Sequence, residues 1–171
     1  RQPGVRGQGS GVIYYCIITA VLNTVTSVAL AGAVLIRGRT ASGPNLPFFF
    51  FILSGGAWSG SYSIWLLSDD PAQALFWTRV LSVVAIMVPS TYYHFIVRLL
   101  GQRDRWLVPL GYVVSLALAV ASATPLIVRE LAPFGGFPYW PRAGVLYIVY
   151  IAFFFAYPAL CWVKLFIAMR Q

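Results

Sequence analysis

The chain has 171 residues, of which 60% are hydrophobic and only 9% are charged, and its formal net charge is +8. Because soluble domains carry about 25% charged residues, this composition excludes a water-soluble fold and predicts an integral membrane protein. The basic residues are scattered between apolar segments rather than clustered with aromatic side chains, so the charge relates to membrane topology and not to a nucleic-acid partner.

Five apolar segments predict five membrane-spanning helices, packed as an all-α bundle in the lipid bilayer. The expected spans cover residues 11–36, 48–67, 72–100, 107–128 and 145–168, after a flexible outer tail of residues 1–10. Residues 11–171 thus form one transmembrane domain. The chain starts at Arg1 rather than Met and stops after Gln171 without a terminating signal, so we expect it to be part of a longer protein.

The basic residues at the ends of these spans predict the orientation. One side of the membrane receives seven of them: Arg37, Arg39, Arg98, Arg103, Arg105, Lys164 and Arg170. The other side receives five: Arg1, Arg6, Arg79, Arg129 and Arg142. Because basic loops stay in the cytoplasm, this distribution predicts that the N-terminus lies outside and the C-terminus in the cytoplasm.

The first two spans carry polar and small residues suited to helix packing. Residues 23–27 include Asn, Thr and Ser near the middle of the first span, where polar side chains usually face other helices. Gly56 and Gly60 form a GxxxG spacing in the second span, which lets a neighbouring backbone approach closely. That neighbour is either another helix of this chain or a second copy of it.

A stripe of aromatic and serine side chains follows the opposite side of the second span. At helical spacing it comprises Ser54, Trp58, Ser61, Tyr62 and Trp65. Tryptophan and tyrosine near the outer end of a span are typical of an interfacial aromatic belt. The same stripe can equally line a ligand site.

The third span is the one around which the others are organised. Asp69 and Asp70 precede Pro71, which is typical of a helix start, and the apolar segment then runs to residue 100. Arg79 lies about two turns inside that start, where a cation is costly unless it is paired, solvated or able to reach the interface. We expect it either to reach the interface, with Asp70 as a partner, or to bind an anionic or polar ligand.

Two further residues of this span bear on its shape and chemistry. Pro89 removes a backbone hydrogen bond and predicts a kink. His94 is the single histidine, and it lacks neighbouring cysteine or carboxylate residues in the sequence. A hydrogen-bonded packing role is therefore the favoured interpretation, and ligation of a tetrapyrrole or haem is the alternative.

The last two spans are joined by an aromatic loop. Ser115, Ala119 and Ala123 give the fourth span a small-residue face, and Pro125 bends or ends it. The loop around residues 134–141 is rich in aromatic residues, Pro and Gly, so we expect it to lie on the membrane surface or to cap a cavity. Pro158 predicts a kink in the fifth span.

Catalytic chemistry finds no support in the sequence. The four acidic residues lie near the ends of spans, there is one histidine, and no Gly-rich phosphate loop follows a strand. Cys16 and Cys161 fall inside apolar segments and show neither metal-binding spacing nor a disulfide framework. We expect a protein that is not an enzyme by itself and that binds no metal.

Several motifs together suggest a family. A Trp-rich second helix at residues 54–62 precedes an outer turn and a Trp-x-Arg third helix at residues 69–79. Pro89 then lies near the centre of the third helix, which ends in the Phe95, Arg98 and Gly101 pattern, and residues 139–147 lead into the fifth span. This arrangement resembles the N-terminal seven-helix sensor region of bacterial histidine kinases and some diguanylate cyclases. The family has seven spans and a cytoplasmic signalling module, whereas five spans are expected here.

The resemblance implies a sensor domain of the bacterial inner membrane that relays an outer or membrane signal to a cytoplasmic output. We expect no cofactor in this domain. The candidate residues for its ligand cavity, under the aromatic loop, are Trp58, Tyr62, Trp65, Trp77 and Arg79. The alternative is an accessory subunit of a larger membrane complex, with a pigment or haem at His94. Both interpretations predict contact with lipid and with other membrane chains or a second copy.

Overall fold

The computed structural model describes residues 6–37 and 43–170. In these ranges the chain forms helices and one two-stranded antiparallel sheet. The elements are α1 Arg6–Arg37, α2 Asn45–Leu66, α3 Pro71–Ala85, α4 Met87–Leu99, α5 Leu107–Ser122, β1 Val128–Phe134, β2 Phe137–Ala143 and α6 Tyr147–Ala168.

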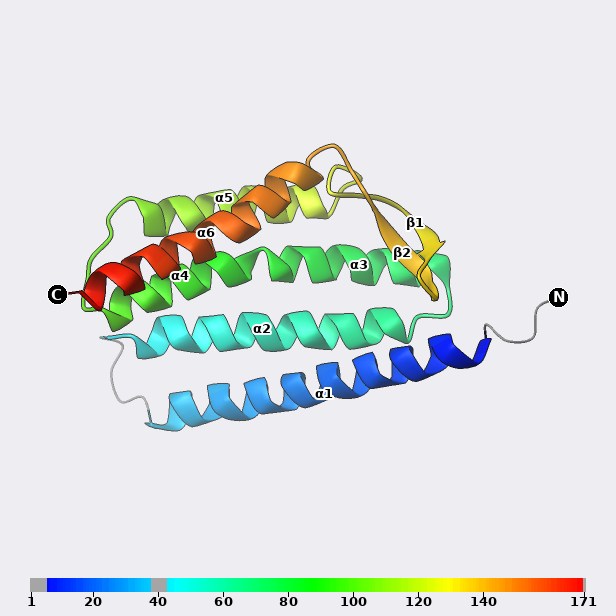
Figure 1. The fold of residues 1–171 in the computed structure, drawn as a ribbon, viewed down its shortest axis with the longest axis horizontal. Helices are drawn as coiled ribbons and strands as arrows, with labels where there is room; N and C mark the ends of the chain where they lie inside the picture. Colours follow the sequence, from blue (N-terminus) through cyan, green and yellow to red (C-terminus); the bar gives the residue numbers. More distant parts are fainter. Residues whose placement is uncertain (1–5, 38–42, 171) are drawn as a thin grey trace.

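The helices run up and down along one long axis, which confirms the helical bundle (Figure 1). α3 and α4 follow each other in line, and the sheet lies at the end where α3 begins. Three segments are long and apolar enough to cross a membrane, Gly11–Ile36, Pro71–Leu99 and Tyr147–Ala168, and Leu107–Ser122 is a shorter apolar helix. The count of five spans and the outside N-terminus remain predictions.

The third predicted span is the central element and consists of two helices. The Asp70 carboxylate caps α3 by accepting a hydrogen bond from the backbone N–H of Gln73 at 2.9 Å. The helix is interrupted at Ile86, one turn before Pro89, whose ring cannot donate a backbone hydrogen bond. The Ser115 hydroxyl donates to the Ile86 carbonyl at 3.0 Å, so the interruption is held by α5.

The GxxxG face of α2 packs against α1 of the same chain. A Cβ added to Gly56 would lie 2.8 Å from Ser27 Cβ, and one added to Gly60 would lie 3.7 Å from Thr24 Cγ2. The Asn23 amide donates to the Ser59 hydroxyl across the same contact. Of the two neighbours expected for this motif, the helix in the same chain is therefore the one the structure shows.

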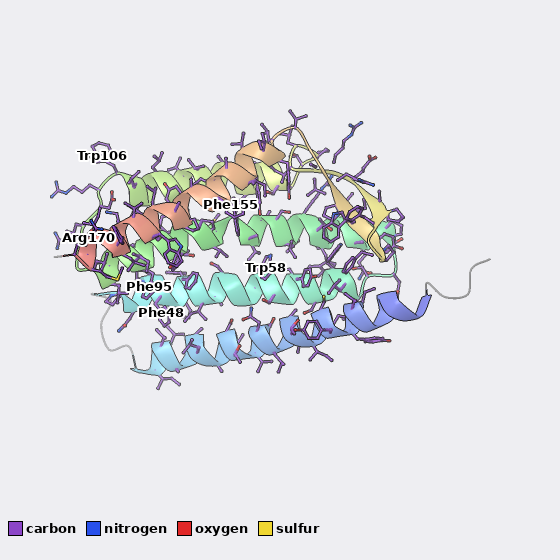
Figure 2. The ribbon with its side chains drawn as sticks, in the orientation of Figure 1. Phe48, Trp58, Phe95, Trp106, Phe155 and Arg170 are labelled. Atoms are coloured by element: carbon purple, nitrogen blue, oxygen red, sulfur yellow. The ribbon has the colours of Figure 1, made fainter. Side chains whose placement is uncertain are left out.

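The core lies among α4, α5, α6 and the chain entering β1. Its most buried members include Ile86, Tyr93, Val97, Ile127 and Cys161. Figure 2 also shows Phe48 and Phe95 close together toward the end of the bundle where the C-terminus lies, and their ring centroids are 4.8 Å apart. α1 adds little to this core, because most of its large apolar side chains are exposed.

Three boundaries differ from the sequence predictions. α1 begins at Arg6, so residues 6–10 of the expected outer tail are helical, while residues 1–5 lie outside the described ranges. The fourth span, expected over 107–128, ends as a helix at Ser122, because Pro125 disfavours helical geometry at the residue before it. The segment expected as an aromatic loop is a β-hairpin. α6 continues as a helix through Pro158, and the kink expected at this residue remains a prediction.

Candidate functional site

The β-hairpin closes one end of the bundle. Gly135 and Gly136 form its two-residue turn with φ of 57° and 87°, which is the left-handed backbone that a tight hairpin turn requires. Phe134 pairs with Phe137 next to the turn, and Ala132 pairs with Trp140. The turn therefore sets the register that places aromatic side chains of the hairpin beside α2.

Six rings from α2 and the hairpin form a continuous aromatic cluster, comprising Trp58, Tyr62, Trp65, Phe134, Phe137 and Trp140. Along α2, the ring centroids of Trp58 and Tyr62 are 5.8 Å apart, and those of Tyr62 and Trp65 are 5.4 Å apart. Trp65 then lies 6.2 Å from both Phe137 and Trp140. Rings at such separations attract one another, so the cluster attaches the hairpin to α2.

A cavity of about 260 Å³ lies beneath the hairpin, and we call it the hairpin cavity. Its walls come from α2, α3, the hairpin and α6, and they include Trp58, Ser82, Trp140, Arg142, Tyr147 and Tyr150. The Tyr150 hydroxyl donates to the Ser82 carbonyl at 3.0 Å, which joins α6 to α3 at the cavity wall. Aromatic walls with a few polar groups are typical of small-molecule sites.

A second cavity, of about 220 Å³, lies beside Trp65 and is lined by Asp69 and Tyr139 among others. The Tyr139 hydroxyl donates to the Asp69 carbonyl at 2.8 Å, which ties the hairpin to the turn before α3. The indole N–H of Trp65 is buried and has no hydrogen-bond partner among the described residues. Buried donors are normally paired, so this one is an exception.

The structure brings together only part of the predicted ligand set. Trp58, Tyr62 and Trp65 share the aromatic cluster, as expected for residues of one stripe. Trp77 instead packs edge-on against Phe76, with 5.4 Å between the ring centroids. Arg79 lines a different groove between α3 and α5. Residues 77 and 79 lie on opposite sides of a helix, so they cannot face one cavity.

Sequence reasoning missed the residues that the hairpin and α6 contribute. Phe137, Trp140 and Arg142 reach the site because they lie on β2, and Tyr147 and Tyr150 because α6 starts beside it. One signal could have found the hairpin, since a Gly-Gly pair between two phenylalanines is typical of a two-residue β-turn. The tyrosines of α6 carry no comparable local signal.

His94 makes the kind of contact expected for a packing role. Its Nδ1 lies 3.1 Å from the Tyr112 hydroxyl, and the two rings meet edge to face with centroids 5.8 Å apart. Within the described part of the chain, no group of three or more His, Cys, Asp or Glu side chains is placed to hold a metal ion. Cys16 and Cys161 are free thiols.

A polar cluster occupies the opposite end of the bundle and consists of Tyr93, Gln102, Asp104 and Lys164. The Tyr93 hydroxyl donates to Asp104 Oδ2 at 2.6 Å, and Lys164 Nζ lies 3.5 Å from the same oxygen. Asp104 Oδ1 accepts from the backbone N–H of Leu107 at 2.9 Å, which caps α5. Lys164 also donates to Gln102 Oε1 at 3.2 Å.

The pKa of Asp104 reflects two opposing causes. Burial favours the protonated acid and raises the pKa, but the Tyr93 hydroxyl, the backbone N–H groups of Leu107 and Trp106, and the charge of Lys164 lower it. The balance leaves the pKa of Asp104 below its ordinary value of 3.8. The carboxylate is thus charged at neutral pH and connects α4, α5 and α6.

Comparison with known proteins agrees with this architecture. The family model for the N-terminal seven-transmembrane region of histidine kinases matches residues 19–171, which is most of the chain. No curated protein and no solved structure matches the chain. The family model confirms the resemblance inferred from the motifs, so the chain is a membrane protein that belongs to the N-terminal seven-transmembrane sensor regions of histidine kinases.

Proposed function

We propose that this region receives a signal at the hairpin end and relays it along α6 to a cytoplasmic output in a bacterial inner membrane. The family match supports a sensor role, and the excess of basic residues on the opposite side supports a cytoplasmic location for the C-terminus. The region itself contributes packing changes and no catalysis. Its partners are lipid and the output segment or chain that α6 reaches.

The hairpin cavity is the observation that carries the proposal. Its walls belong to four different parts of the fold, and α3 and α6 meet there through Tyr150 and Ser82. A ligand that fills the cavity, or a change in bilayer packing around it, alters the separation of α3 and α6. A signal shifts the population only if it favours one of the two arrangements energetically.

α6 provides the route from this cavity to the other end. Tyr150 contacts α3 near the start of α6, and two turns later the Tyr157 hydroxyl donates to the Leu107 carbonyl at 2.9 Å. Lys164 then reaches Asp104 and Gln102. A small rotation or translation of α6 therefore changes contacts at both ends, which is a common form of helix-based switching.

Distance measurements between spin labels test this relay in the purified chain. The labels are placed at the exposed positions Leu46, in the first turn of α2, and Met169, directly after α6. The start of α2 and the end of α6 both lie toward the C-terminal end of the bundle (Figure 1), and Cys16→Ser and Cys161→Ala first remove the native thiols. Trp140→Ala enlarges the hairpin cavity, and Tyr150→Phe removes the hydrogen bond to Ser82. Each variant is expected to change the ratio of the populations that show the two label distances. A free-energy bias of 1.4 kcal/mol changes this ratio about tenfold.

Trp162→Ala is the matched control, because Trp162 is an exposed tryptophan on α6 that lines none of the described cavities. It should leave the distance distribution unchanged. If Trp140→Ala and Tyr150→Phe also leave it unchanged, the two ends are uncoupled and the relay is wrong. If all three variants shift it equally, α6 responds to any loss of side-chain volume and the hairpin cavity has no special role.

A further inference from the structure

A groove of about 380 Å³ runs between α3 and α5, separate from both cavities of the hairpin end. α3 contributes Leu75, Phe76, Val80 and Val83 at helical spacing, and Ala123 closes the groove from the end of α5. Arg79 supplies the single cation in this apolar lining, and no acidic side chain of the described residues lines it. The groove combines a hydrophobic trough with one positive charge.

Arg79 is not neutralised by any residue in the described part of the chain. Its Nε is buried and has no hydrogen-bond partner among those residues. In the described residues Arg79 forms no ion pair, so the expected pairing with Asp70 is not formed, and the Asp70 carboxylate instead caps the start of α3. An unpaired cation with a desolvated donor is costly in an apolar environment, and an anion from outside the protein would remove that cost.

The depth and size of the groove indicate what kind of anion fits. Arg79 follows Asp70 by nine residues, which is about 14 Å along a helix and places it below the headgroup level if α3 starts at the interface. A phospholipid phosphate remains at that level, whereas a single-chain carboxylate can enter more deeply. A carboxylate also matches the planar guanidinium, with which it forms paired hydrogen bonds.

We propose that the groove between α3 and α5 binds the anion of a long-chain fatty acid, with its carboxylate on Arg79 and its alkyl chain along Leu75, Phe76, Val80 and Val83. The inference does not depend on the relay through α6, because it concerns a different surface and is measured by binding alone. It assigns Arg79 to a lipid-binding site distinct from the hairpin cavity.

Photo-crosslinking tests the assignment on the whole chain in phosphatidylcholine nanodiscs. The probe is palmitate with a diazirine in its alkyl chain, and the specific signal is the labelling that excess unlabelled palmitate displaces. That labelling should map to α3 between residues 72 and 83 and to the end of α5. Arg79→Gln should weaken palmitate competition about tenfold or more, because hydrogen bonds to charged groups contribute strongly.

Two further variants and two competitors make each outcome decisive. Arg129→Gln removes an exposed cation of β1 that lines none of the described cavities and should leave labelling unchanged, while Ala123→Trp keeps Arg79 but fills the groove and should abolish it. Displaceable labelling that survives Ala123→Trp, or palmitate competition that is as strong in Arg79→Gln as in the unaltered chain, overturns the proposal. Equal competition by hexadecanol would show that the negative charge is irrelevant, and stronger competition by phosphatidylglycerol would replace the fatty acid with an anionic phospholipid.

Discussion

Both ends of the bundle contain packed rings and side-chain hydrogen bonds, but within the described residues they differ in charge, because only the end opposite the hairpin contains an ion pair. At the hairpin end, rings from α2, β1 and β2 pack with centroids roughly 5 to 6 Å apart around two cavities, and the Trp65 N–H has no partner in the described part of the chain. At the opposite end, Asp104 accepts hydrogen bonds from α4 and α5 and forms an ion pair with Lys164 of α6. Ring packing tolerates small displacements, whereas a hydrogen-bond network holds one geometry. The hairpin end is thus the adaptable one.

Removing the Asp104 carboxylate should have the largest effect on stability. Asp104→Ala deletes the cap of α5, the acceptor of Tyr93 and the partner of Lys164 together. We expect a loss of about 2 to 4 kcal/mol in the free energy of unfolding, measured by circular dichroism in mixed micelles of increasing SDS fraction.

Asp70→Ala is the matched control at the other end, since Asp70 also caps a helix but has a single described side-chain hydrogen bond. The loss of this hydrogen bond in Asp70→Ala should lower the free energy of unfolding by about 1 kcal/mol. Equal effects of the two substitutions would show that Asp104 acts only as a cap and that the cluster with Tyr93 and Lys164 contributes nothing.

A second test concerns Gly111, where α5 and α6 approach closely near the Asp104 cluster. A Cβ at this position would lie 2.6 Å from Tyr157 Cε1, so Gly111→Ala forces the Tyr157 ring and its hydrogen bond to Leu107 to move. Overpacking of this kind costs about 1 to 3 kcal/mol. The same SDS titration measures it.

Gly55→Ala serves as the reference for that substitution, because a Cβ at Gly55 meets no atom within 4 Å. It should leave stability unchanged or raise it by up to about 1 kcal/mol through helix propensity. A Gly111→Ala protein as stable as the Gly55→Ala protein would show that the contact between α5 and α6 can yield, which contradicts a rigid C-terminal end.

Replacing one aromatic polar group at each end compares them directly. Tyr93→Phe removes a hydrogen bond to a carboxylate and should cost about 1.5 kcal/mol or more. Trp65→Phe removes an N–H that has no hydrogen-bond partner in the described structure. This substitution therefore reduces the ring volume but breaks no hydrogen bond. Thermal unfolding of the two variants in the same detergent should show the larger decrease for Tyr93→Phe, and the reverse order would refute the comparison.

Periodicity and glycine spacing were sufficient to predict most of the bundle. The second and fifth spans were placed within three residues of α2 and α6, and the GxxxG face of α2 meets a helix as that motif requires. The hairpin was missed because Pro133, Pro138 and Pro141 favour an irregular loop. Both strands of a two-stranded sheet are edge strands, however, and edge strands tolerate proline.

The candidate site was harder to predict because it is assembled across distant segments. The stripe of Trp58, Tyr62 and Trp65 lies on one helix, so its spacing alone revealed it. Trp140 and Tyr150 join it only through the hairpin register and the packing of α6. Arg79 was singled out as an unusual cation and grouped with Trp58, but the structure places it in a separate groove between α3 and the end of α5.

The smallest expected effect is the pH dependence of the Asp104 cluster. The folded-state pKa of Asp104 is lower than its ordinary value of 3.8, so its contribution to stability is fully present above pH 4 and is lost as the pH falls through the folded-state pKa. The difference in melting temperature between the unaltered chain and Asp104→Asn should therefore be constant from pH 8 to pH 5 and shrink below pH 4. A difference that already shrinks between pH 7 and pH 5 would mean that the carboxylate is destabilised by burial and that Tyr93 and Lys164 do not hold it in the charged form.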